Sequence, residues 1–294
     1  MLQMPALTPL EFADKYRKLK TFLYPQELPA GVAPSYVPPK GWTSTPVEHY
    51  RLGKSNWWHV FWTQDIAPRL GKSLSLRISN IYGNDQEVEL TPHQLARHFY
   101  PSFVGKGSPE QAQIAIQLTY RYRRVTTQLA DFLKADFIGL DCNGFVGNYI
   151  QRVVKGWGQS WTSFDNDRDP GPTTLMSGII STCCDKPIAS TNQLSRNEIY
   201  IFVLCERDGM VIDPGEKHRW GHVMITNPNS LMPLPDGKCK LKVVEATGQG
   251  MKLRDTDYTI QSATPAKFGT VFTVLRGPGD TSHGMSVRIA RLKT

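Results

Sequence analysis

Three residues of this chain have the types that nucleophilic hydrolysis of an amide requires: a thiol, an imidazole and a carboxylate. Cys142 lies in the stretch GLDCNGFVGNY, His222 follows a glycine in GHVMIT, and Glu245 interrupts the apolar run VVEAT. A thiolate can attack an amide carbonyl when an imidazole takes its proton, and a carboxylate that accepts the other imidazole N–H orients the ring. The order and types of these residues therefore predict a Cys-His-Glu site.

The thiol is expected on the first turn of a helix. Apolar residues follow it at offsets 3, 4, 7, 8, 11 and 12, a helical stripe that should end near Gly156. Asp141 is the natural N-cap. The unpaired N–H groups of this turn, near Asn143 and Gly144, together with the helix dipole, favour a thiolate and could hold an oxyanion.

Each of the three residues also has a purely structural interpretation. Cys142 can be a small buried hydrophobic residue, His222 a hydrogen-bonded structural histidine, and Glu245 a charge on an edge strand that faces water. The remaining cysteines form no Cys-x-x-Cys pair, so a zinc site is disfavoured. A Gly-x-Ser-x-Gly elbow and a phosphate-binding loop are both missing from the sequence. No metal and no cofactor are expected.

The elements that would position these residues are helices first and strands later. Helix starts with Pro after a hydroxyl residue occur in TPLE, TPHQ and SPEQ, at Thr8, Thr91 and Ser108. The first helix should reach about Leu23 and the third about Leu133. Residues 24–46 contain six prolines and are expected to form an extended linker or arm.

The C-terminal half should consist of strands. Expected strands cover residues 198–205, 221–226, 239–247, 268–276 and 285–292. The segments between them contain turn residues and no convincing helix, so the sheet should be largely antiparallel. Helices followed by strands predict the α+β class. Residues 156–187 are rich in Gly, Pro and aromatic residues, and could form either an active-site loop or a structural excursion.

The motifs DCNGFV, GHVMI and VVEAT together resemble the NlpC/P60 branch of the papain-like cysteine peptidases. The resemblance implies that Cys142 is the nucleophile and His222 the base. Asp141 and Gly144 match the helix start of that family. Asn143 replaces the usual serine, and Glu245 stands where the family more often has His, Asn or Gln.

The same resemblance implies a fold and an activity. The fold would be a papain-like NlpC/P60 core in residues 105–294, with the Cys-bearing helix packed on an antiparallel sheet. Residues 1–104 would form a helical, Pro-rich accessory region. The activity would be hydrolysis of amide bonds in peptidoglycan stem peptides through an acyl-thioester. Alternatives are a deamidase or acyltransferase acting on protein or lipid, and an inactive binding module.

Composition bounds the partners and the compartment. The net charge is +8 and the pI about 9.2, which favours an anionic polymer as a partner, although no nucleic-acid motif accompanies the basic residues. No run of 18 apolar residues is present, so no membrane span is expected. The N-terminal residues lack the pattern of a Sec signal. Together with the odd number of cysteines, five, this predicts a cytoplasmic protein or one delivered by a non-Sec route.

Overall fold

The chain forms two compact units, which are described separately. The computed structural model describes residues 7–34, 40–50, 57–123, 138–159, 176–213, 221–248, 252–277 and 284–294. Unit 1 consists of Met1–Glu11, Pro170–Glu245 and Leu253–Thr294, and unit 2 of Phe12–Asp169 and Ala246–Lys252. Unit 2 thus contains residues on both sides of position 105, and the expected domain boundary there stays a prediction.

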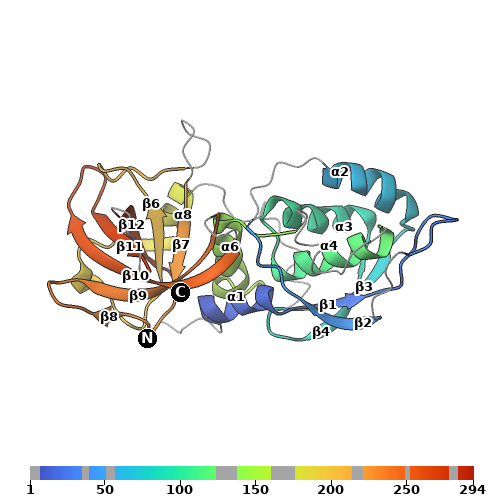
Figure 1. Cartoon of the computed structure of the whole chain (residues 1–294), viewed down its shortest axis with the longest axis horizontal. Coiled ribbons are helices and arrows are strands. Elements are labelled where there is room, and N and C mark those ends of the chain that lie inside the picture. Colours follow the sequence, from blue (N-terminus) through green and yellow to red (C-terminus); the bar gives the residue numbers. More distant parts are fainter. Residues whose placement is uncertain are drawn as a thin grey trace. The chain divides into compact units, whose positions relative to one another are not determined.

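Unit 1 is built around a closed antiparallel β-barrel (Figure 1). Six strands form it: β6 (Tyr200–Leu204), β7 (Val223–Thr226), β9 (Cys239–Thr247), β10 (Lys252–Thr264), β11 (Val271–Arg276) and β12 (Met285–Leu292). The order runs β10-β11-β12-β6-β7-β9, and β9 also pairs with β10, so the sheet closes. The short strands β5 (Cys184–Pro187) and β8 (Met232–Pro233) add to β12 and β9 from outside the ring.

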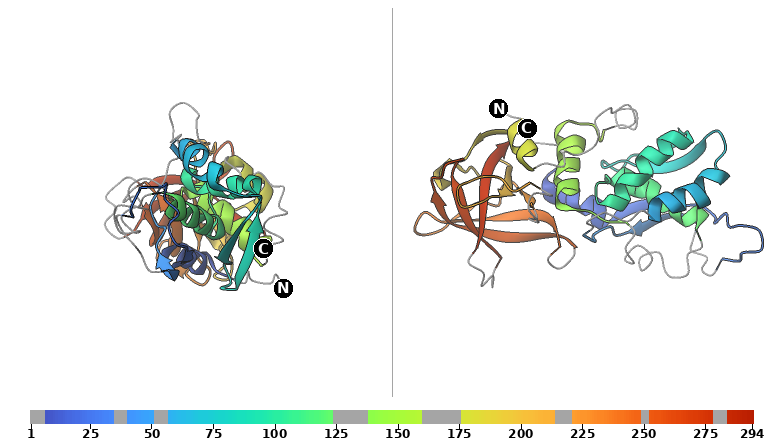
Figure 2. Two further views of the ribbon diagram at one scale, coloured as in Figure 1. Left: turned by 90° about the vertical axis from the view of Figure 1, so that its right-hand side faces the viewer. Right: turned by 90° about the horizontal axis from the view of Figure 1, so that it is seen from above.

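Alternate residues of the barrel strands form one apolar cluster in the interior. It includes Tyr200, Phe202, Met224, Leu241, Val243, Tyr258, Ile260, Phe272, Val274, Val287 and Ile289. Successive residues of a strand point to opposite faces, so this spacing of two marks the inward positions. Figure 2 shows the curvature of these strands from two further sides. A register shift between Ile260 and Ser262 interrupts the ladder of β10 with β11.

The expected papain-like α+β core, with a helix packed on an open sheet, is wrong. The structure is mostly β with a closed six-strand barrel, and the described residues contain six short α-helices. The predicted fold is wrong mainly because strand β10 was not among the expected strands. Its polar sequence KLRDTDYTIQSAT hides the alternation, yet it pairs with both neighbours and thereby closes the ring.

The five strands that the sequence predicts are confirmed as β6, β7, β9, β11 and β12, and their pairings are antiparallel. Part of the segment 156–187 is regular structure, because α8 (Met176–Cys183) and β5 lie in it. Residues 160–175 of that segment lie outside the described part.

The first expected helix begins as predicted, with its first residues in unit 1 and the rest in unit 2, but it ends early. Helix α1 (Pro9–Arg17) starts after a reciprocal cap, in which the Thr8 N–H donates to Glu11 Oε2 and the Glu11 N–H donates to Thr8 Oγ1. The chain then forms strand β1 (Leu19–Leu23), which pairs with β2 (Gly41–Thr45). The expected end of the helix at Leu23 is therefore wrong, because residues 19–23 form a strand. Within the segment 24–46, which was expected to be an extended linker or arm, residues 41–45 form the paired strand β2.

The longest helix of unit 2 that the structure describes is α4 (Pro109–Tyr122), and nearly all of its residues are buried. The other elements of the unit are α2 (Trp57–Phe61), a π-helical turn (Trp62–Ile66), β3 (Leu74–Ser79), β4 (Asp85–Leu90), α3 (Pro92–Phe99) and α6 (Cys142–Tyr149). Capping boxes at Thr91 and Ser108 confirm the predicted starts of α3 and α4. Helix α4 ends at Tyr122, and the rest of its expected stripe falls outside the described residues.

The helix that carries Cys142 starts and ends as predicted. Asp141 is its N-cap, and α6 continues as a π-helical turn (Ile150–Val154) to Lys155. Its apolar face packs on helix α1 of the same unit: the ring of Phe12 lies 5.8 Å from that of Phe145 and 5.7 Å from that of Tyr149. Within the described residues, no helix combines the length and apolar character needed to cross a membrane.

A glycine allows the start of α6 to approach a neighbouring loop closely. A Cβ at Gly144 would lie 1.9 Å from the carbonyl oxygen of Gly105, whereas a Cβ at Gly71 would meet nothing closer than 4.0 Å. We expect Gly144→Ala to lower the free energy of unfolding by about 1–3 kcal/mol, because backbone must shift to admit the methyl group. Urea denaturation of both variants measures this, and equal stability of Gly144→Ala and Gly71→Ala would contradict the close contact.

Candidate functional site

The start of α6 holds Cys142 beside a neutralised carboxylate. Cys142 is the first helical residue and its side chain is buried. The Asp141 carboxylate accepts the N–H of Gly144 at 2.5 Å and forms an ion pair with Lys106 Nζ at 2.6 Å. A carboxylate next to a thiolate is repulsive, but here a cation faces it at contact distance. The positive charge of Lys106 therefore offsets the negative charge of Asp141 next to Cys142.

Burial and pairing act in opposite directions on Asp141. Burial raises its pKa, whereas the charge and hydrogen bond of Lys106 and the N–H groups of Gly144 and Asn143 lower it, and the pKa is raised on balance. The backbone N–H of Asp141 also donates to the Gly105 carbonyl at 2.9 Å. The helix start is thus fixed to the loop at Gly105 and Lys106 from both its backbone and its side chain.

Two polar side chains lie near the thiol: Tyr50, which was not predicted there, and Asn143, which was predicted at the helix start. The hydroxyl of Tyr50 lies against Cys142: burial, the neighbouring Cys142 and Asp141, and a hydrogen bond with Cys142 all raise the pKa of Tyr50. The side-chain amide of Asn143 is buried, and among the residues that the structure describes neither its oxygen nor its nitrogen has a hydrogen-bond partner. Such an unsatisfied amide is costly, so it marks a position at which an additional polar group would bind favourably.

The imidazole and the carboxylate are in direct contact in unit 1. Nε2 of His222 lies 2.6 Å from Oε2 of Glu245, whose side chain is completely buried. The alternative in which Glu245 is a water-facing edge charge is therefore excluded. With Nε2–H donating to the carboxylate, the lone pair of the neutral ring is on Nδ1, which makes Nδ1 the basic atom.

Three further side chains surround Glu245. Its Oε1 accepts the Arg254 Nε–H at 3.0 Å and the Tyr258 hydroxyl at 2.8 Å, and its Oε2 accepts from Arg276 Nη2 at 3.0 Å. Arg276 Nε also donates to the Tyr258 oxygen at 2.7 Å. Burial alone would raise the pKa of Glu245, but the hydrogen bond and charge of His222, the charge of Arg276 and the Tyr258 hydroxyl hold it at about 2. The carboxylate is therefore ionised at any neutral pH.

The barrel places this polar cluster at one end of its interior. Glu245 follows the inward residue Val243 by two positions in β9, and Arg276 follows Val274 by two in β11. His222 precedes the inward Met224 by two positions at the start of β7. Because inward positions recur every second residue, these side chains extend the apolar stripes into a polar cap. Tyr258 is the register partner of Arg276 across β10 and β11.

The structure brings His222 and Glu245 together in unit 1, whereas Cys142 belongs to unit 2. Cys142, Asp141 and Asn143 belong to unit 2, so the approach of the Cys142 sulfur to the His222 ring stays a prediction.

Five groups around these residues were not predicted from the sequence: Tyr50, Lys106, Arg254, Tyr258 and Arg276. The only available signal was Arg276, a charge two residues after the apolar Val274 in FTVLR.

The depressed pKa of Glu245 makes stability depend on pH. A carboxylate whose pKa falls from 4.5 in the unfolded chain to about 2 in the fold stabilises the fold above pH 4.5 and loses that contribution as the pH falls toward 2. At about 1.4 kcal/mol per pKa unit, we expect a loss of about 3 kcal/mol in the free energy of unfolding. Denaturant titrations from pH 6 to about 2 measure it. The difference between wild type and Glu245→Gln should shrink over this window, and a constant difference would contradict the assignment.

The unsatisfied amide of Asn143 predicts an unusual stabilising substitution. We expect Asn143→Leu to raise the free energy of unfolding by about 1–3 kcal/mol, because it removes an uncompensated buried polar group. Asn148→Leu on the same helix is the matched control, since the Asn148 amide donates to the carbonyls of Lys106 at 2.9 Å and Gly144 at 2.7 Å. That variant should be destabilised. Equal destabilisation of both variants in thermal melts would show that the Asn143 amide is satisfied.

Comparison of the chain with family models, with curated proteins and with solved structures finds no match. The resemblance of its three motifs to NlpC/P60 peptidases therefore stays a prediction.

Proposed function

We propose that the protein is a thiol-dependent hydrolase of amide bonds. Cys142 is the nucleophile, His222 is the general base and Glu245 orients the ring. The observation that carries this proposal is the buried His222–Glu245 pair, with its 2.6 Å contact through Nε2. A structural histidine needs a partner, but not an ionised carboxylate held by two arginines and a tyrosine.

The reaction follows from the atoms of these groups. His222 Nδ1 takes the proton of the Cys142 thiol, and the thiolate attacks the carbonyl carbon of the amide. Backbone N–H groups at the start of α6 stabilise the oxyanion. When the C–N bond breaks, the imidazolium returns its proton to the leaving amine and an acyl-thioester remains. Water, deprotonated by the same imidazole, then releases the acid and the free thiol.

Peptidoglycan stem peptides are the first substrate class to test, because the resemblance of the three motifs points to them. The net charge of +8 also favours an anionic polymer. A deamidase or an acyltransferase would use the same three residues on another carbonyl substrate, and a binding module would use none of them chemically.

Two equally buried cysteines allow a direct test of the nucleophile. Cys142 and Cys239 are 4% and 5% exposed, so access to them is similar, but burial raises the pKa of Cys239 to about 11. We expect iodoacetamide at pH 7 to label Cys142 at least about tenfold faster than Cys239, since the thiolate is the reactive form. Peptide mass spectrometry resolves the two rates.

The base is tested in the same assay. His222→Gln should slow the labelling of Cys142 and leave that of Cys239 unchanged, because only the first thiol requires the imidazole. Equal labelling of the two cysteines, or a Cys142 rate that ignores His222→Gln, would overturn the hydrolase proposal in favour of a binding module.

Purified muropeptides then test the substrate. Wild-type protein should release peptide fragments that Cys142→Ala does not, as followed by liquid chromatography. Rapid labelling of Cys142 without any cleavage would retain the thiol chemistry and move the substrate to another carbonyl compound.

A further inference from the structure

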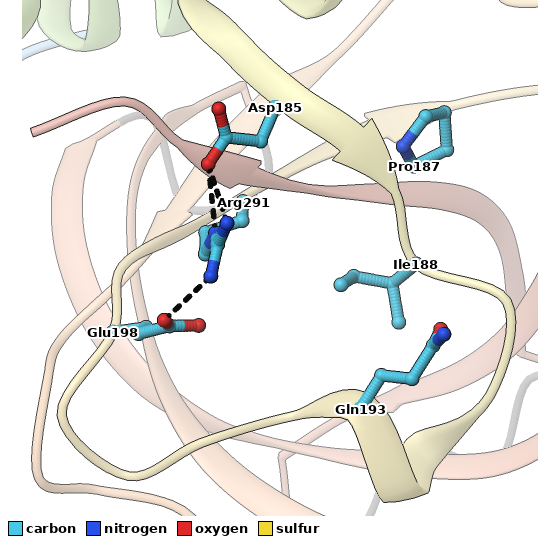
Figure 3. A pocket seen from close by; sticks show the side chains of 6 residues that line it. All are labelled: Asp185, Pro187, Ile188, Gln193, Glu198 and Arg291. Atoms are coloured by element: carbon cyan, nitrogen blue, oxygen red, sulfur yellow. Dashed lines mark hydrogen bonds and ion pairs between the residues drawn. The ribbon is translucent and has the colours of Figure 1, made fainter.

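A cavity lies in unit 1 beside strand β5, where β6 begins and β12 ends (Figure 3). It is bounded by β5, by the end of β12 and by the connection from β5 to β6, and its volume is about 430 Å³. This lies within the roughly 300–1,000 Å³ of small-molecule sites. None of its lining residues belongs to the His222–Glu245 cluster, so the proposed hydrolase does not use it.

One wall of the cavity is an arginine held between two carboxylates. Arg291 donates to Asp185 Oδ2 from Nε at 2.8 Å and pairs with the same oxygen through Nη2 at 2.7 Å. Its Nη1 donates to Glu198 Oε1 at 2.8 Å. Glu198 Oε2 accepts the hydroxyl of Tyr200 at 2.9 Å. Figure 3 shows Arg291 with Asp185 and Glu198 on one side of the space, and Pro187, Ile188 and Gln193 on the other side.

The charges of this wall do not cancel. Two carboxylates and one guanidinium leave a formal charge of −1, and each carboxylate has about four lone-pair sites, more than the donors that reach it. An added ligand is therefore favoured if it brings donors and a positive charge. An anion would meet two carboxylates, and Arg291, the cation among the described lining residues, is already paired with both of them.

The opposite wall is apolar. Pro187 and Ile188 line it, and Ile188 is buried against the core cluster. A ligand that spans the cavity thus needs an apolar stem and a cationic end. We propose that this cavity binds a primary alkylammonium group, with the ammonium on the cavity side of the Asp185 and Glu198 carboxylates, beside Arg291, and the alkyl stem on Ile188. A lysine-like side chain of a peptide and a free diamine share this chemistry.

Binding is tested with the full chain and defined probes. Nα-acetyl-lysine amide and 1,5-diaminopentane are titrated against Nα-acetyl-norleucine amide, which has the stem without the charge, and the side-chain amide signal of Gln193 is followed by NMR. We expect saturable shifts with the ammonium probes and an affinity at least about fivefold above that of the uncharged probe, the upper range of an exposed ion pair. Binding of the peptide-like probe alone assigns the site to peptides, and binding of both assigns it to alkylammonium groups in general.

Charge variants make the proposal falsifiable. Glu198→Gln and Asp185→Asn each remove one negative charge from the cavity and should weaken the ammonium probes by about fivefold. Asp257→Asn removes an exposed carboxylate that pairs with Lys240 at 2.7 Å elsewhere in the unit, and should leave the affinity unchanged. If one cavity variant fails to fold, as judged by its amide spectrum, the other one decides. Equal binding of the norleucine probe, no saturable shift, or the same loss in Asp257→Asn would overturn the proposal.

Discussion

A buried carboxylate imposes the main constraint on the barrel end. Glu245 is completely enclosed, and an ionised group in that position is stable only when donors surround it. The donors come from three other places in the sheet: His222 at the start of β7, Arg254 and Tyr258 on β10, and Arg276 at the end of β11. A single side chain therefore ties four strands together, and β10 must pair on both sides for these donors to converge.

The same carboxylate makes the two ring nitrogens of His222 different, because Glu245 contacts only Nε2. Because the carboxylate engages Nε2, the ring has a defined tautomer and its basic atom is Nδ1. This arrangement suits a base that must be neutral before it takes a proton.

In unit 2, close contacts fix the start of helix α6. At the start of α6, the loop at Gly105 and Lys106 approaches so closely that only glycine fits at position 144, and Lys106 neutralises the cap at Asp141. The thiol, Tyr50 and the unsatisfied amide of Asn143 lie at this helix start or against it. The buried amide of Asn143, without a hydrogen-bond partner among the described residues, lowers stability at this helix start.

The sequence by itself determined the local elements. Its capping residues defined the starts of α1, α3, α4 and α6, and its period-two patterns defined most strands, because both depend on neighbours a few positions apart. It also singled out His222 and Glu245, whose polar character interrupts apolar surroundings. The closure of the sheet was decided only by tertiary structure, since the polar strand β10 pairs with partners that no local pattern names. The same holds for Lys106, Arg254 and Arg276: a long-range ion pair leaves no mark in the sequence near either residue, because the burial that makes it necessary exists only in the fold.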